Sequence, residues 1–261
     1  MSLPLMPRDS RLDRTARLTG HDALDLMDTT PVIIFGLGGV GSWTAEALVR
    51  TGFSRLTLVD ADCVAPTNIN RQMPATASTI GRVKVDVVAE RLRDINPEAE
   101  ITAIHGLYDK ETAGQYDLAS YGYVFDCIDS LSDKALLILN ATRASSPAGM
   151  RFYSSMGAAL KTDPTRIATA EFWKVKGCPL AAALRRRFKK SGQFPARKFT
   201  CVYSDELVGQ HPAYRPAAEV NDGSLTYNKA ATNGSLMHIT ATFGLILASL
   251  AIRDITRRAE K

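Results

Sequence analysis

The chain has 261 residues, of which 45% are hydrophobic and 23% charged, as is typical of a soluble globular protein with one large domain or two small ones. Its start, Met1–Arg8, lacks the apolar core of a signal peptide, and its longest late apolar run, Ile239–Ile252, is shorter than the roughly 20 residues that span a bilayer. Net charge is +5, and because the excess is concentrated in one segment it favours a polyanionic partner.

The first 30 residues form an arginine-rich leader in which one short helix, Asp22–Asp28, is expected. Four arginines precede that helix: Arg8, Arg11, Arg14 and Arg17. We treat residues 1–30 as a segment separate from the alternating pattern that follows.

A glycine motif follows the leader in the order strand, turn, helix. Val32–Phe35 is a short apolar run, Gly36–Gly41 reads GLGGVG, and Ser42–Arg50 has a helical pattern. Glycines let the backbone approach a polyphosphate closely, and the amino end of a helix offers free N–H groups and partial positive charge. The next apolar run, Arg55–Asp60, ends in an acid placed where it would reach a ribose hydroxyl. This order predicts a nucleotide-binding site.

Strand and helix patterns continue to alternate after this unit. The expected elements are a helix at Val83–Ile95, a strand at Ile101–His105, a buried strand at Tyr123–Ile128, a helix at Lys134–Ser145 and a strand at Arg151–Met156. Such alternation predicts an α/β fold with a Rossmann-like, mainly parallel sheet and helices on both faces. Ligands of such sheets lie beyond the carboxyl ends of the strands, where the glycine motif, Asp60 and the residues after Ile128 all fall.

The pattern changes after about residue 160. A strand at Ala168–Val175 and an amphipathic basic helix at Pro179–Lys190 are expected, then an aperiodic loop over 205–235 and a closing helix at Leu236–Arg258. We therefore divide the chain into the leader, a Rossmann-like nucleotide-binding core over 31–160, and a region over 161–261. That last region holds the basic segment, a crossover loop and the closing helix of the same domain.

The basic segment, Phe172–Ser204, contains no acid. Its cations are Lys174, Lys176, Arg185, Arg186, Arg187, Lys189, Lys190, Arg197 and Lys198. A one-signed run of this density favours a nucleic acid, on whose bases the interleaved Phe188, Phe194 and Phe199 could stack. The alternative is a solvated helix face above core phenylalanines.

The glycine motif alone does not separate ATP from NAD, because Gly36, Gly38 and Gly41 also satisfy the dinucleotide fingerprint. Further polar residues favour a triphosphate: Asn68, Asn70, Arg71 and Gln72 after the second strand, Lys84 on the next helix, and Asp129 after the fourth strand. Arginine grips phosphate oxygens bidentately, lysine supplies a point charge, and a carboxylate holds the magnesium that bridges phosphates. Taken singly, Lys84 could be a surface residue and Asp129 a helix cap.

In this order, GLGGVG, Asp60, NINRQ, Lys84 and CIDS resemble the ubiquitin-activating-enzyme superfamily of carboxylate-adenylating enzymes. Further segments are similar to one branch, the tRNA threonylcarbamoyladenosine dehydratases: TARL at 15–18, GVGSW at 39–43, AEAL at 45–48, RTG at 50–52, DPT at 163–165, CVYS at 201–204 and TATFG at 240–244. With these segments the resemblance spans nearly the whole chain.

The resemblance implies an ATP-dependent enzyme in which a carboxylate attacks the α-phosphate of ATP and forms an acyl-adenylate and pyrophosphate. In this branch the carboxylate belongs to the threonyl group of a modified adenosine in tRNA. The neighbouring carbamoyl group then closes a ring, AMP leaves, and the nucleoside has lost one water. Residues 31–160 would be the adenylation core, with ATP and Mg²⁺ as cofactors.

The resemblance also implies roles for individual residues. Gly36, Gly38, Gly39 and Gly41 would cradle phosphates, Asp60 would hold the ribose, and Asp129 would bind magnesium. Asn68, Asn70, Arg71, Gln72 and Lys84 would contact the triphosphate, and Arg185, Arg186, Arg187, Lys189, Lys190, Arg197 and Lys198 would bind tRNA. Arg14 or Arg11 of a second subunit would reach the γ-phosphate, which implies a homodimer. The resemblance is compatible with a monovalent cation near the site and with a sulfur-relay protein as a partner.

Other functions stay open at this stage. An adenylyltransferase for a ubiquitin-like sulfur carrier shares the core motifs, but such enzymes commonly hold zinc in two C-x-x-C pairs. The four cysteines of this chain have no such spacing, so no zinc is expected, and they form no evident disulfide framework, which fits the cytoplasm. Cys201 is the candidate for a transfer thiol. An NAD-dependent oxidoreductase and a tRNA-binding module with a relic nucleotide site are further alternatives.

Overall fold

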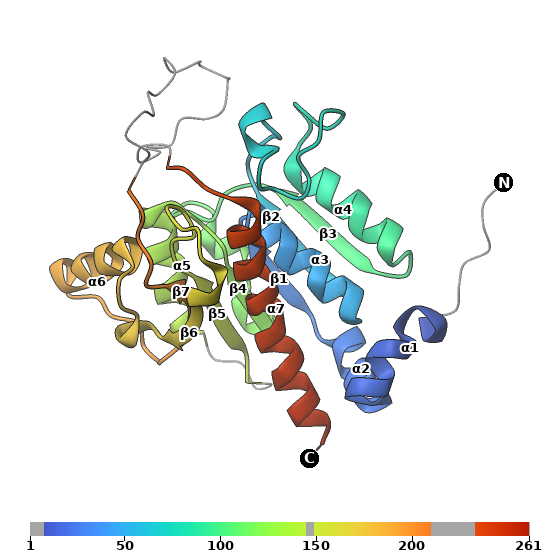
Figure 1. The fold of residues 1–261 in the computed structure, drawn as a ribbon. Coiled ribbons are helices and arrows are strands. Elements are labelled where there is room, and N and C mark those ends of the chain that lie inside the picture. The colour runs from blue at the N-terminus through green and yellow to red at the C-terminus, as the bar shows by residue number, and fades with distance from the viewer. Residues whose placement is uncertain (1–7, 145–148, 210–232, 261) are drawn as a thin grey trace.

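A seven-stranded sheet forms the centre of the computed structural model, which describes residues 8–144, 149–209 and 233–260 (Figure 1). The strand order is β3-β2-β1-β4-β5-β7-β6. The strands are β1 (Val32–Phe35), β2 (Arg55–Asp60), β3 (Glu100–His105), β4 (Tyr123–Asp126), β5 (Arg151–Ser155), β6 (Ile167–Glu171) and β7 (Thr200–Ser204). Neighbours pair in parallel except β6 and β7, which are antiparallel. The predicted Rossmann-like, mainly parallel sheet is therefore confirmed.

Helices cover both faces of the sheet, as predicted (Figure 1). They are α1 (Arg8–Thr19), α2 (His21–Thr29), α3 (Gly41–Thr51), α4 (Lys84–Ile95), α5 (Leu131–Arg143), α6 (Pro179–Ser191) and α7 (Met237–Ala259). Helices α3, α4 and α7 share one buried apolar cluster with the sheet, and α5 and α6 share another on the opposite face.

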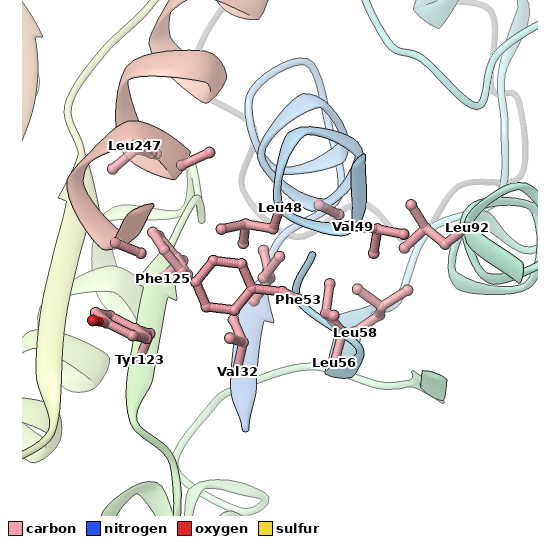
Figure 2. Close-up of a cluster of buried hydrophobic side chains, with 14 of the residues drawn as sticks. Val32, Leu48, Val49, Phe53, Leu56, Leu58, Leu92, Tyr123, Phe125 and Leu247 are labelled. Carbon is pink, nitrogen blue, oxygen red and sulfur yellow. The ribbon is translucent and has the colours of Figure 1, made fainter. Parts of the chain in front are cut away.

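The central strands are apolar because helices bury them from both sides. Every residue of β1 and β4 is buried. Figure 2 shows one resulting cluster, in which Phe53 lies between the strand residue Val32 and Leu48 of α3. Each such side chain removed from water contributes roughly 1.5–3 kcal/mol, which holds the first strand–turn–helix unit together.

Helix α7 is long and apolar enough to cross a membrane by length and composition, but half of that stretch is buried inside the protein. It packs closely on α3: a Cβ atom added to Gly244 would lie 2.5 Å from the Val40 carbonyl oxygen. The Thr44 hydroxyl donates a hydrogen bond to the Gly244 carbonyl over 3.2 Å. The expected buried closing helix is thus confirmed, and it holds the helix that follows the glycine motif.

The sequence-based assignment missed two elements. The leader contains two helices, α1 and α2, whereas one was predicted, because α1 is mostly polar and buries Leu12. Strand β7 was missed because its residues, TCVYS, neither alternate between polar and apolar nor are apolar throughout. The strand predicted over Ala168–Val175 ends at Glu171, where the chain turns into a 3-10 helix, Phe172–Lys174. Most of the loop predicted over 205–235 lies outside the described residues.

Candidate functional site

The glycine turn joins β1 to α3 at the carboxyl edge of the parallel strands. Gly36 has a φ of 86°, and a Cβ atom there would lie 2.7 Å from the carbonyl oxygen of Cys127, which follows β4. A Cβ atom on Gly41 would lie 1.8 Å from the Gly36 carbonyl oxygen. Only glycine fits at these two positions. The Gly36 and Leu37 amides donate to the Val59 carbonyl and the Asp60 carboxylate, so the amides that would face an anion are those of Gly38–Gly41, at the amino end of α3.

Asp60 ends β2 directly beside the glycine turn. Its carboxylate accepts hydrogen bonds from the backbone amides of Leu37, over 2.6 Å, and Asp62, over 2.8 Å. Burial raises the pKa of this carboxyl above its ordinary value, while Lys84 opposes the shift. Lys84 is itself buried at the start of α4 and donates to Asp62 over 2.8 Å. The strand therefore ends in a carboxylate that backbone amides hold in place, close to the buried Lys84 side chain.

Arg71 lies in the segment that follows a short 3-10 helix, Pro66–Asn68. Its guanidinium donates to the Thr67 carbonyl over 2.9 Å and to the Asn70 side chain over 3.0 Å. Desolvation lowers the pKa of Arg71, and the nearby charge of Asp129 acts in the opposite direction. Arg71 and Asp129, which follow different strands, are thus near enough for the charge of one to influence the other.

Asn68 and Gln72, which flank Arg71, are both buried but differ in their hydrogen bonds. Asn68 is buried, and its side-chain oxygen accepts from the Ala65 amide over 3.1 Å, so it caps the 3-10 helix. Gln72 is also buried, and its side-chain oxygen has no hydrogen-bond partner. The Gln72 side-chain nitrogen lies 3.6 Å from where a Cβ atom of Gly38 would be. A buried polar atom without a partner is costly. The Gln72 side chain thus lies beside Gly38 through its nitrogen, while its oxygen is left without a donor among the described residues.

Asp129 is exposed two residues after Cys127, at the same edge of the sheet. Among residues 8–144, 149–209 and 233–260, no group of three or more His, Cys, Asp or Glu side chains gathers as a metal site. A single carboxylate is nevertheless a usual protein contribution to magnesium, which takes its other ligands from phosphates and water.

A buried ion pair below Asp129 was not predicted. Lys134 lies 2.8 Å from Asp126, and both side chains are fully buried. Asp126 also accepts from the Ser154 hydroxyl over 2.6 Å, and Lys134 donates to the Ile128 carbonyl over 2.9 Å. The signal for it was an acid at the end of an otherwise apolar strand, since a buried carboxylate requires a partner.

The leader arginines lie away from these residues within the single chain. Arg11 donates to Glu98 over 2.6 Å and to Asn96 over 3.2 Å. These partners follow α4 and precede β3, at the amino edge of the sheet. Arg14 is exposed on α1. Arg14 and Arg11 are the candidates to reach the γ-phosphate of a second subunit, and of these two Arg14 has the side chain that is free to extend away from its own chain.

The cations of the basic segment fall into two groups. Arg185 donates to the carbonyls of Phe172 and Val175, and Arg197 donates to those of Ala141 and Ala144 at the end of α5. These two arginines tie elements together. The remaining candidates are exposed: Lys174, Lys176, Arg186, Arg187, Lys189, Lys190 and Lys198.

The prediction that Phe188 and Phe199 stack on bases is wrong, because both rings are buried. They are core residues of the amphipathic pattern. Phe194 is exposed, and Trp173, which the sequence did not single out, is exposed beside it.

Cys201 lies fully buried on β7, between Ser154 of β5 and Ala170 of β6. Burial raises the pKa of its thiol well above the ordinary value. Because the thiolate is the reactive form of cysteine, this position does not suit a transfer thiol.

Comparison with known proteins finds relatives that match nearly the whole chain. The ThiF family model matches residues 12–261. The tRNA threonylcarbamoyladenosine dehydratase of Escherichia coli is 37% identical, with 96% of this chain and 95% of that protein covered. The crystal structure of the E. coli tRNA N6-threonylcarbamoyladenosine dehydratase in complex with ATP has a TM-score of 0.81 at 34% identity and 99% coverage of both chains. The E. coli molybdopterin-synthase adenylyltransferase is 32% identical over 47% of this chain.

Proposed function

The chain belongs to the ThiF family, and we propose that it catalyses the ATP-dependent dehydration of threonylcarbamoyladenosine in tRNA. The observation that carries the proposal is the gathering of four features at one sheet edge, in a chain similar over its full length to dehydratases of this substrate. These features are the glycine turn, Asp60, Arg71 with Gln72, and Asp129.

ATP is the nucleotide that fits this edge. The Gly36–Gly41 turn and the amino end of α3 offer backbone amides to the phosphates. Asp60 accepts two backbone hydrogen bonds, and a carboxylate has further lone pairs for a ribose hydroxyl. The Gln72 side-chain nitrogen, which lies beside Gly38, would supply a further donor to the phosphates.

Arg71, Asn70 and Lys84 would contact the triphosphate. Two contacts already orient the Arg71 guanidinium, so little side-chain entropy is lost when phosphate binds. Asp129 would hold Mg²⁺, which neutralises phosphate charge when bound. These groups stabilise the negative charge that develops as the α-phosphate is attacked.

The reaction has two steps. A carboxylate oxygen of the threonyl group forms a bond to the α-phosphorus as the bond to pyrophosphate breaks. The carbamoyl group then attacks the activated carbonyl carbon and gives up a proton, a ring closes, and the bond from that carbon to the phosphate oxygen breaks, so that AMP departs with the oxygen that leaves the substrate. The protein supplies positioning and charge, because adenylation itself provides the good leaving group.

We further propose a homodimer in which Arg14 from a second copy of the chain reaches the γ-phosphate. Arg14 is preferred over Arg11 because Arg11 is bound to Glu98 and Asn96 of its own chain. The exposed cations of the basic segment would bind the tRNA backbone, with Arg185 and Arg197 supporting them from beneath. The reaction would take place in the cytoplasm.

The second candidate is activation of the carboxyl-terminal Gly-Gly of a ubiquitin-like sulfur carrier. Similarity to the molybdopterin-synthase adenylyltransferase supports it, but that similarity extends over 47% of the chain. An adenylyltransferase for a small protein would not explain a 33-residue stretch, Phe172–Ser204, that is free of acids.

Pyrophosphate release separates the two candidates. The purified chain is supplied with ATP and magnesium together with either tRNA carrying threonylcarbamoyladenosine or a carrier protein ending in Gly-Gly. We expect release that depends on the modified tRNA and stops when unmodified tRNA replaces it. Release that needs the Gly-Gly protein and ignores tRNA would contradict the proposal and establish the second candidate.

A further inference from the structure

Two large aromatic side chains, one before and one after the basic helix α6, are exposed beside each other. Trp173 is 41% exposed and Phe194 is 48% exposed. Their ring centroids lie 6.2 Å apart with 42° between the planes. Trp173 belongs to the 3-10 helix after β6, and Phe194 lies between α6 and β7, so two separate segments bring the rings together.

Buried aromatic rings hold this exposed pair in place. Trp173 packs edge-to-face on Phe172 at 5.2 Å, and Phe172 has no exposed surface. Phe172 in turn stacks on Phe199 at 5.1 Å and contacts Phe188 at 5.9 Å. Because the core fixes Trp173, the protein would lose little conformational freedom when a planar ligand stacks on the pair.

Charge indicates the chemistry of that ligand. Lys174 is adjacent to Trp173 in sequence, and Lys198 follows Phe194 by four residues, both exposed. The exposed Arg186, Arg187, Lys189 and Lys190 lie on the helix between the two rings in sequence. No acid occurs from Phe172 to Ser204. Aromatic rings bordered by cations are the combination that binds single-stranded nucleic acid, in which the rings stack on bases and the cations contact phosphates.

The pair lies far from the glycine turn. Strand β6 runs against the others, so its end, and with it Trp173, is at the amino edge of the parallel strands. Phe194 precedes β7 at the same edge, whereas the glycine turn is at the carboxyl edge of β1, with β4 and β5 between β1 and β7 (Figure 1). A base stacked here is therefore not the reacting nucleoside.

From these positions we infer that Trp173 and Phe194 form a stacking platform for unpaired nucleobases of the tRNA, remote from the nucleoside that reacts. The inference rests on the proposed function and adds to it a second point of contact. The platform fixes the tRNA by its bases while the cations of α6 hold its backbone. It contributes to tRNA affinity and leaves ATP binding unchanged.

Binding of fluorescently labelled tRNA, measured by anisotropy, tests the platform. We expect the Trp173→Ala/Phe194→Ala variant to bind tRNA roughly tenfold or more weakly, in line with the loss of base stacking. Trp173→Phe and Phe194→Tyr keep a stacking ring and should bind like the wild type. Leu245→Ala, which removes an exposed apolar side chain on α7, is the matched control. All variants should bind ATP with wild-type affinity in calorimetry, which also verifies folding.

Tryptophan fluorescence gives a direct readout, because the chain has two tryptophans, Trp43 and Trp173. Quenching by tRNA should occur in the wild type and largely disappear in Trp173→Phe, although that variant still binds.

Unchanged tRNA affinity of the double alanine variant, with tRNA-dependent turnover intact, would overturn the platform and leave the proposed function standing. A change in oligomeric mass without a change in tRNA affinity would likewise overturn it, in favour of an interface between copies. Failure of the wild type to bind tRNA would overturn both.

Discussion

The Lys134 ammonium lies 2.8 Å from the Asp126 carboxylate, and neither side chain has any exposed surface. The pair joins the end of β4 to α5, and Ser154 ties it to β5. Lys134 also binds the Ile128 carbonyl, directly before Asp129. The ion pair thus fixes the turn against which Gly36 packs and from which Asp129 extends.

Removal of the lysine alone should be strongly destabilising. Lys134→Met would leave the Asp126 charge buried without its partner, and we expect a loss of about 3–5 kcal/mol in the free energy of unfolding in urea. The double variant Asp126→Asn/Lys134→Met carries neither charge and should recover most of that loss. Equal stability of Lys134→Met and the wild type would show that the pair does not organise this turn.

Gly36→Ala should disrupt the nucleotide edge. The new Cβ atom would lie 2.7 Å from the Cys127 carbonyl oxygen, at a φ of 86° that costs a non-glycine residue roughly 1–2 kcal/mol before any clash. We expect ATP binding to be lost in calorimetry. Gly114→Ala is the matched control, because a Cβ atom there meets nothing within 4 Å; it should bind ATP normally. Normal ATP binding by Gly36→Ala would argue against a phosphate cradle at this turn.

Arg71 should matter through its shape as well as its charge. For Arg71→Ala we expect kcat/KM for ATP, followed by AMP formation, to fall by about 10²–10³, as on loss of a preorganised donor. Arg71→Lys retains the charge but not the bidentate fork and should be intermediate. Arg55→Ala removes an arginine that pairs with Glu100 at the amino edge, and its activity should be unchanged. A fully active Arg71→Ala would remove this residue from the site.

Cys201 should be inert in the folded protein. Burial and its raised pKa keep the thiol protonated, whereas Cys63 is exposed. After brief treatment of the native protein with an alkylating agent, mass spectrometry of peptides should find label on Cys63 and none on Cys201. Unfolding in urea should expose both. Rapid labelling of Cys201 in the native protein would revive the transfer-thiol hypothesis.

Glu206 should make part of the protein's resistance to unfolding fall as the pH becomes acidic. Its carboxylate accepts from the Thr162 and Asp163 amides and from the Thr162 hydroxyl, and these bonds lower its pKa from 4.5 to about 2. A lowered pKa stabilises the folded state above the ordinary pKa, and that stability is lost as pH falls from 4.5 towards about 2. In Glu206→Gln the urea midpoint should therefore decline less across this range. An identical decline in both proteins would exclude Glu206 as its source.

The sequence predicted most of the sheet because buried parallel strands are apolar throughout and the turns between them carry glycine or polar residues. Val32–Phe35 and Tyr123–Asp126 show this pattern. The pattern did not predict α1, which buries few side chains, or β7, whose residues neither alternate nor are apolar throughout. Local pattern does not reveal such elements, because tertiary packing decides them.

The sequence predicted which residues belong to the candidate site but not which contacts each of them makes. The sequence placed Arg71 and Asp129 after different strands, and in the fold the charge of Asp129 influences the pKa of Arg71. It did not distinguish Arg186, which is exposed, from Arg185, which binds backbone carbonyls, since adjacent helical residues face different directions. It also assigned base stacking to Phe188 and Phe199, although both rings, one on α6 and one directly before β7, are buried in the core.

The most direct test of the central claim is mass spectrometry of nucleosides from tRNA that carries threonylcarbamoyladenosine, incubated with the protein, ATP and magnesium. Digestion must be mild, because a cyclic product hydrolyses easily. We predict an ATP-dependent loss of one water from the nucleoside, with AMP formed in equal amount and neither product seen with Gly36→Ala. An unchanged nucleoside, under conditions in which the wild type binds both ATP and tRNA, would contradict the assignment.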